Sequence, residues 1–153
     1  MSTPPQQALT GNAAMLAEAL DWVGTPYRHQ GSTKGVGCDC LGLIRGAWQA
    51  VYGVEPEAAG PYTQDWAEAG GEDLFLAAAR RHCFERQSTD AQPGDLLLFR
   101  WRPHLPAKHA GILVDTNHFI HAYQGHSVII SSLVPQWRQR IAAVLAFPEP
   151  MNS

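Results

Sequence analysis

The segment G-V-G-C-D-C-L-G-L at 35–43 places a cysteine where a thiol could act as a nucleophile. Glycines precede Cys40 and a helical pattern follows it, so we expect Cys40 in the first turn of a helix, with Asp39 as the N-cap. The positive end of a helix lowers the pKa of a cysteine, whereas the neighbouring carboxylate of Asp39 raises it. Because free cysteine is also among the most buried residue types, this segment alone leaves a nucleophile and a core residue equally open.

Histidines stand in two later segments that have the composition of strands. His109 opens the run H-A-G-I-L-V-D, in which the small residues after it leave room for a substrate, although a lone histidine at a strand start is more often structural. His118 and His121 are three residues apart in H-F-I-H-A-Y, so their side chains point to opposite faces of a strand. If the two strands form a hairpin, one of these histidines lies beside His109.

A cysteine, a histidine base and a polar group that orients the base are the parts of a thiol hydrolase. Their order here is cysteine on a helix, histidine on a strand and a polar residue on the next strand, which is the papain-like order. The cysteines and the seven histidines could also supply metal ligands. However, C-x-C without a second close pair lacks the spacing of a structural zinc site, so we expect no metal and no other cofactor.

Apolar residues recur at helical spacing in three stretches of the first half of the chain. They predict a helix that follows residue 11 and ends at Gly24, a second over about 40–52 with Gly53 as its stop, and a third over 72–84. In the third helix we expect Leu74, Phe75 and Ala78 to face inward. A short helical piece is also expected near 63–69.

After Pro93-Gly94 the period changes to that of strands. Turn residues separate five short runs rich in β-forming residues, at 95–101, 109–115, 119–124, 127–133 and 141–147. Helices first and strands afterwards predict an α+β domain whose N-terminal helices pack on a mostly antiparallel sheet. Residues 1–11 are expected to form a flexible leader and 12–150 a single domain.

The overall composition excludes several classes of protein. The chain has 153 residues, of which 45% are hydrophobic and 16% charged, as expected of one folded domain. A net charge of −3 argues against a nucleic-acid binder. No apolar run approaches the roughly 18 residues of a membrane span. Residues 1–24 lack the basic start of a signal peptide, so we expect cytoplasmic synthesis and export by another route.

Charge is unevenly distributed along the chain. Residues 1–79 contain 3 basic and 9 acidic groups, whereas residues 80–153 contain 8 and 5. Such asymmetry can favour contact with an anionic polymer or another subunit, although a solvated surface of mixed charge is the commoner reason.

Five motifs in order resemble those of the NlpC-type cell-wall cysteine peptidases. They are G-T-P-Y at 24–27, D-C-L-G-L at 39–43, Q-P-G-D-L-L-L-F at 92–99, H-A-G-I-L at 109–113 and F-I-H-A at 119–122. Each motif alone would be a weak signal, but together they span roughly residues 13–147. The amino-acid sequences of 25–43 and 137–148 are similar to those of the phage and gene-transfer-agent branch, whose members are associated with tails. The resemblance implies a papain-like fold with a sheet of five to six strands.

The resemblance also implies a role for each matching residue. Cys40 matches the nucleophile, His109 the general base, and His121 the polar residue that orients the base. Tyr27 matches a tyrosine that lines the active site near the oxyanion position. Asp39 matches an acidic residue that in some members helps to hold the amine end of the substrate.

Three positions depart from the family pattern or match nothing in it. Leu41 stands where many members have serine, and its apolar side chain lacks the serine hydroxyl. His29 stands where many have tryptophan, which implies a more polar pocket wall. Cys38 matches no family role, and Cys83, in an arginine-rich segment, is expected to be structural.

The activity that the resemblance implies is hydrolysis of peptidoglycan stem peptides, in particular at the γ-D-glutamyl to diamino-acid bond. It implies a protein of a virion or gene-transfer-agent tail that opens the cell wall locally, with stem peptides and tail proteins as partners. Two alternatives stay open. One is a structural or attachment protein of the tail that has kept the fold without catalysis. The other is a thiol acyltransferase, because an amine instead of water can release an acyl-enzyme.

Overall fold

The computed structural model describes residues 10–55 and 74–150. The helices are α1 (Gly11–Asp21), α2 (Cys40–Tyr52), α3 (Leu74–His82) and α4 (Pro135–Arg138), with a short 3-10 helix η2 (Ser88–Asp90). The strands are β1 (Ser32–Thr33), β2 (Gly37–Cys38), β3 (Phe84–Arg86), β4 (Leu96–Phe99), β5 (His109–Asp115), β6 (His118–Ala122), β7 (Val128–Ser132) and β8 (Ile141–Ala146). In these ranges, no helix is long and apolar enough to cross a membrane.

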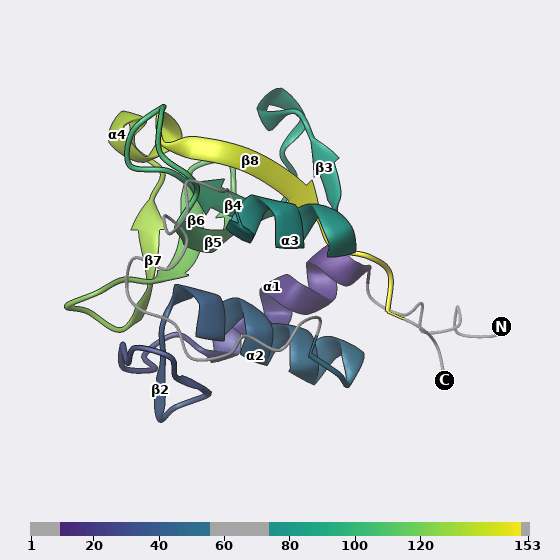
Figure 1. The fold of residues 1–153 in the computed structure, drawn as a ribbon. Coiled ribbons are helices and arrows are strands. Elements are labelled where there is room, and N and C mark those ends of the chain that lie inside the picture. The colour runs from purple at the N-terminus through teal and green to yellow at the C-terminus, as the bar shows by residue number, and fades with distance from the viewer. Residues whose placement is uncertain (1–9, 56–73, 151–153) are drawn as a thin grey trace, which may run out of the picture.

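Six strands form one antiparallel sheet in the order β3-β8-β4-β5-β6-β7, and β1 and β2 form a separate small hairpin. In Figure 1, α1 and α2 lie together on one side of the sheet, and α4 lies at the end where β8 begins. The predicted α+β class, with helices packed on an antiparallel sheet, is confirmed.

Alternation along the strands gives the sheet two different faces. One face packs on α1 and α2, and its buried residues include Leu98, Ala110 and Ile120. The other face carries a smaller cluster made by Leu97, Phe99, Leu113, Phe119, Leu133 and Val144. Because Phe99 pairs with His109 in the register of β4 and β5, the His109 side chain lies on the same face as this second cluster.

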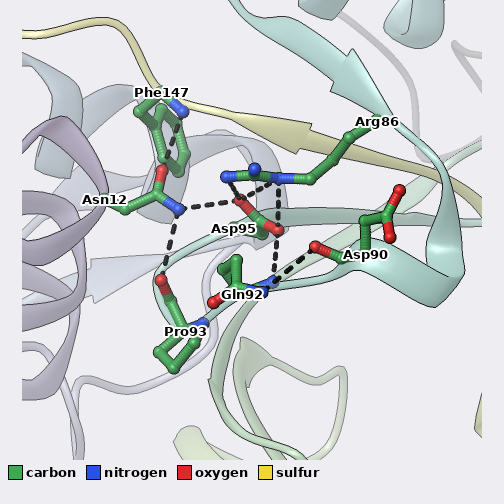
Figure 2. A network of polar contacts seen from close by, with 7 residues as sticks. All are labelled: Asn12, Arg86, Asp90, Gln92, Pro93, Asp95 and Phe147. Carbon is green, nitrogen blue, oxygen red and sulfur yellow. Dashed lines mark hydrogen bonds and ion pairs between the residues drawn. The ribbon is translucent and has the colours of Figure 1, made fainter.

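A buried carboxylate ties the start of β4 to α1 and β3 (Figure 2). Asp95 has no exposed surface, and its oxygens accept hydrogen bonds from Asn12 Nδ2 and the Gln92 backbone N–H, each at 2.7 Å. The guanidinium of Arg86 completes the set, with Nε 3.0 Å from Oδ2 and Nη2 3.0 Å from Oδ1 of Asp95. Asn12 also accepts from the backbone N–H of Phe147. This network anchors the strand that lies beside the one carrying His109.

The structure differs from the predicted elements in several places. Helix α1 begins at Gly11, which is buried and was expected in the leader, and Thr10 is the N-cap. Leu74 is 40% exposed, contrary to prediction, because Phe75, Leu76 and Ala79 form the buried stripe of α3. The third helix stops at His82, and Phe84 then pairs with β8 as part of a strand that the sequence did not reveal. The β1–β2 hairpin and α4 were also not predicted.

The remaining expectations on local structure divide in two. The predicted strands of the second half all occur, with ends within two residues of those expected. The expected helical piece at 63–69 and most of the expected leader, residues 1–9, lie outside the described residues.

Candidate active site

Cys40 is the first residue of α2, and the loop before it is held against the helix by Asp39. Asp39 is buried, and its two carboxylate oxygens accept from the backbone N–H groups of Gly42 and Gln30, each at 2.7 Å. A Cβ on Gly42 would lie 1.6 Å from the carbonyl oxygen of Gly31, so the loop packs this closely only on glycine. The predicted N-cap is therefore confirmed, and it places the thiol at the helix start.

The thiol lies beside the first residues of β5. Cys40 is partly exposed, and its Sγ donates to the carbonyl oxygen of Lys108 at 3.7 Å. The backbone N–H groups of Ala110 and Leu41 favour the thiolate, but burial and the charge of Asp39 outweigh them and raise the pKa of Cys40 to about 12. The sulfur thus meets the backbone on both sides of His109.

His109 is the first member of a chain of hydrogen bonds across three strands. Its Nε2 lies 2.8 Å from Nδ1 of His121, and Nε2 of His121 lies 2.8 Å from the hydroxyl oxygen of Ser131. Both histidines are buried. A base that takes a proton on Nδ1 must carry hydrogen on Nε2 and donate it to His121, which in turn donates from its own Nε2 to Ser131. This tautomer leaves the Nδ1 lone pair of His109 available for a thiol.

Burial keeps both histidines neutral. It lowers the pKa of His109 to about 3, with a further contribution from His121. It also lowers the pKa of His121 to about 4, assisted by His126. The free site therefore contains a thiol and a neutral imidazole. At the thiol, desolvation exceeds the stabilisation of a thiolate by the helix end.

Aromatic rings surround the two histidines on the second face of the sheet. Trp101 stacks on His109 with 5.7 Å between ring centroids, and Trp137 lies 5.6 Å from His109 and 5.2 Å from His121. Tyr123 stacks on His121 at 5.3 Å. These rings exclude water from the imidazoles and limit their rotation, which explains the lowered pKa values.

Tyr27 lies on the thiol side of the site. It forms an isolated parallel bridge with Cys38, which brings its segment alongside the one that leads to Cys40. Burial raises the pKa of Tyr27 to about 12, with further contributions from Cys40, Asp39 and Cys38. The hydroxyl therefore stays protonated at neutral pH and can donate a hydrogen bond.

The other predicted side chains lie outside the contacts that link Cys40, His109, His121 and Ser131. His118 points away, as expected, and its Nδ1 lies 2.9 Å from Asp115 at the exposed end of the hairpin. Nδ1 of His29 lies 3.7 Å from Asp39. Cys38 and Cys83 are buried, and burial raises the pKa of each to about 12. Within residues 10–55 and 74–150, no three histidine, cysteine or acidic side chains are grouped to hold a metal ion.

Ser131 is the site residue that sequence reasoning missed. It pairs with Phe119 in the register of β6 and β7, one step diagonally from His121 on the same face. The available signal was a hydroxyl on the inward face of a predicted strand, but serine is common in strands and its partner depends on the register.

Comparison with known proteins agrees with this geometry. Residues 24–146 match the NlpC/P60 family. The chain is 31% identical over 128 residues to the murein DD-endopeptidase MepS/murein LD-carboxypeptidase of Escherichia coli K12, a match that covers 82% of this chain and 57% of that protein. It is 30% identical over 132 residues to a probable endopeptidase NlpC homolog of Haemophilus influenzae, with coverage of 86% and 60%. The chain thus spans about 60% of the length of these curated relatives.

Solved structures resemble the whole described fold. The NlpC/p60 domain of the peptidoglycan hydrolase SagA superposes with a TM-score of 0.61 at 28% identity, over 89% of this chain and 98% of that one. An NlpC/P60 family protein of Bacillus cereus superposes with a TM-score of 0.64 over 92% of this chain and 41% of that one, and at 17% identity it supports the fold alone. The match to residues 24–146 covers every residue of the thiol and histidine site, and on that basis the chain belongs to the NlpC/P60 family.

Proposed function

We propose that this protein is a cysteine peptidase that hydrolyses amide bonds in peptidoglycan stem peptides. The observation that carries the proposal is the hydrogen-bonded row of His109, His121 and Ser131, together with the contact of the Cys40 thiol with the backbone of Lys108, the residue before His109. A nucleophile, a base and groups that orient the base are the parts needed for acyl transfer to sulfur.

The first half of the reaction forms a thioester. Sγ of Cys40 attacks the carbonyl carbon of the substrate amide while Nδ1 of His109 takes the thiol proton, because Nε2 is engaged with His121. The resulting imidazolium gives this proton to the amide nitrogen, the C–N bond breaks, and the amine leaves. The imidazolium is stabilised by His121, which accepts from it and donates onward to Ser131.

Water completes the cycle. It attacks the thioester and gives a proton to His109, which returns it to sulfur as the carboxylic acid product leaves. The backbone N–H of Cys40 is among the first N–H groups of α2, which have no acceptor within the helix. Together with the Tyr27 hydroxyl it can stabilise the oxyanion, and a well-placed donor contributes about 3 kcal/mol.

The choice of substrate rests on the relatives and on the family motifs. The named relatives include a murein DD-endopeptidase and, in Bacillus subtilis, a γ-DL-glutamyl hydrolase that is 29% identical over 90% of this chain and 30% of its own length. The bond that we propose is the γ-D-glutamyl to diamino-acid link. Asp39 is proposed to help hold the amine end of the substrate through its negative charge, which also acts on the Cys40 thiol, because both of its oxygens already accept backbone hydrogen bonds.

The decisive experiment uses purified protein and purified peptidoglycan. Incubation should release fragments whose new termini, identified by mass spectrometry, lie at the γ-D-glutamyl bond. Cys40→Ala is the matched control and should release none, whereas a chelator should leave activity intact. Fragments with other stem-peptide termini would correct the bond but keep the peptidase. Fragments released only when an amine is added, and carrying that amine as an amide, would identify an acyltransferase. If the wild type releases no fragments, the protein is instead a tail attachment protein.

We also propose that the protein acts as part of a phage-like tail. The support is the similarity of the amino-acid sequences of 25–43 and 137–148 to the tail-associated branch of the family. Particles purified from a producing strain should contain this chain by mass spectrometry. Its presence only in the particle-free fraction would overturn the assignment.

A further inference from the structure

A cavity with a volume of about 520 Å³ adjoins the aromatic side of the active site. It lies between the loop that follows β4 and the segment that runs from α4 into the start of β8. The polar and aromatic residues that line it are Arg100, Trp101, Arg102, Gln136, Gln139 and Arg140. Trp101 is shared with the active site, because its ring stacks on His109.

The cavity is strongly cationic. Within the described part of the chain, its lining includes three basic residues, Arg100, Arg102 and Arg140, and no aspartate or glutamate. Arg140 lies over the rings of Trp101 and Trp137, at 5.2 and 5.7 Å from their centroids. Such contacts hold a guanidinium in position without neutralising its charge, and its N–H edge stays able to bind a carboxylate.

The other polar groups complement Arg140. Arg102 is exposed at the rim of the cavity, and the amides of Gln136 and Gln139 are exposed donors. Arg100 donates to the carbonyl oxygens of Pro103 and Leu105, which shapes the loop around the cavity. No acidic side chain lines the cavity among the described residues. An anion that entered would therefore meet donors and positive charge with no repulsion.

The position of the cavity assigns it to one side of the scissile bond. In the proposed mechanism His109 protonates the leaving amine, so the leaving part of the substrate lies next to His109. Trp101 joins His109 to the cavity. We propose that this cavity is an anion-binding subsite, which receives a carboxylate carried by the amine-side portion of the peptide substrate. This inference rests on the proposed function and adds a specificity determinant to it.

Two synthetic peptides test the subsite. They differ only in the amine-side residue, which carries a free carboxylate in one and a carboxamide in the other. The wild type should cleave the carboxylate peptide with a kcat/KM about tenfold higher or more, as expected for one charge-assisted contact. Arg102→Gln and Arg140→Gln should each bring this ratio toward one, and Arg102→Lys should restore part of it. Equal kcat/KM for the two peptides in the wild type would overturn the proposal.

Arg138→Gln is the matched control. Arg138 also lies in α4, but its guanidinium donates to the carbonyl oxygen of Thr116, and it does not line the cavity. Its removal changes the net charge equally and should leave the preference intact. The same loss of preference in Arg138→Gln as in Arg102→Gln would show a general charge effect and overturn the subsite.

Binding separates failure of the subsite from failure of the peptidase function. Cys40→Ala is titrated with each peptide by calorimetry, and the titration is repeated with Arg102→Gln added. Tighter binding of the carboxylate peptide that is lost with Arg102→Gln supports the subsite, even if the wild type cleaves neither peptide and the proposed function falls. Equal binding of the two peptides by Cys40→Ala rejects the subsite, whatever the wild type cleaves.

Discussion

The Nδ1 atom of His121 lies 2.8 Å from the Nε2 atom of His109, the ring nitrogen that faces away from the proposed reaction. This bond ties the orientation and the tautomer of the base to a second buried imidazole. A neutral histidine stabilises an imidazolium less than a carboxylate would. The onward bond to Ser131 compensates in part, since it polarises His121 in the same direction.

We predict that the cysteine and the histidines of the site contribute unequally to catalysis. Cys40→Ala and His109→Ala should each lower kcat/KM by at least about 10³-fold, because nucleophile and base act as a unit. His121→Ala should leave a larger residual rate, since it breaks no bond itself. His118→Ala, which loses only the contact with Asp115, should keep the wild-type rate. Murein cleavage kinetics measure the series, and a silent His121→Ala with a crippled His118→Ala would contradict the assignment.

Ser131→Ala should lower kcat about tenfold, the effect of losing one hydrogen bond of roughly 1.4 kcal/mol. The hydroxyl accepts from Nε2 of His121 and so selects its tautomer. Ser131→Thr keeps the hydroxyl and should restore most of the rate. Nitrogen-15 NMR of the imidazoles gives an independent readout. An unchanged His121 tautomer in Ser131→Ala would show that the serine only packs there.

Alkylation by iodoacetamide should modify Cys40 first, because Cys40 is partly exposed while Cys38 and Cys83 are buried. Since burial raises the pKa of Cys40 to about 12, its rate should keep rising with pH above neutrality. Peptide mapping after brief labelling between pH 5 and 9 measures this. A rate that is constant over pH 5–8 would instead indicate a thiolate–imidazolium pair in the free enzyme, and faster labelling of Cys38 or Cys83 would exclude Cys40 as the reactive thiol.

Acid should destabilise the fold through the two buried histidines. Their pKa values of about 3 and 4 in the folded protein lie below the ordinary 6.5, so below pH 6.5 the unfolded chain binds more protons. Stability that is fully present above pH 6.5 should fall by about 2 kcal/mol per histidine on going to pH 5. Urea unfolding at pH 7 and pH 5 measures the loss. In His121→Gln the loss should be smaller by about one histidine's share, and an equal loss would contradict the buried neutral state.

Asp95→Ala should destabilise the protein by about 3 kcal/mol, because Arg86, Asn12 and the Gln92 N–H lose a shared buried acceptor. Part of the expected penalty is screened by solvent, since the Arg86 side chain is 33% exposed. Denaturant unfolding measures it. Asp115→Ala is the control and should cost much less stability, because that carboxylate is exposed although it accepts from the Asn117 N–H and contacts His118. Equal stability of the Asp95 variant would show that the network adds nothing to folding.

Local patterns in the sequence were sufficient for the elements that carry the site. The N-cap at Asp39 and the stop at Gly53, whose φ is +84°, define α2 from side-chain chemistry and backbone freedom within a few residues. The two-residue period of a strand likewise separates the face of His118 from that of His121. The family motifs added the roles of the site residues as expectations.

Tertiary structure alone decided the rest, because each missing feature depends on a partner far away in the chain. Strand β3 exists through its pairing with β8, some 60 residues later. Ser131 meets His121 only through the register of β6 and β7. The protonation of the thiol and the imidazoles follows from burial by rings of separate elements, including Trp101 and Trp137, and sequence spacing cannot report how much water such rings exclude.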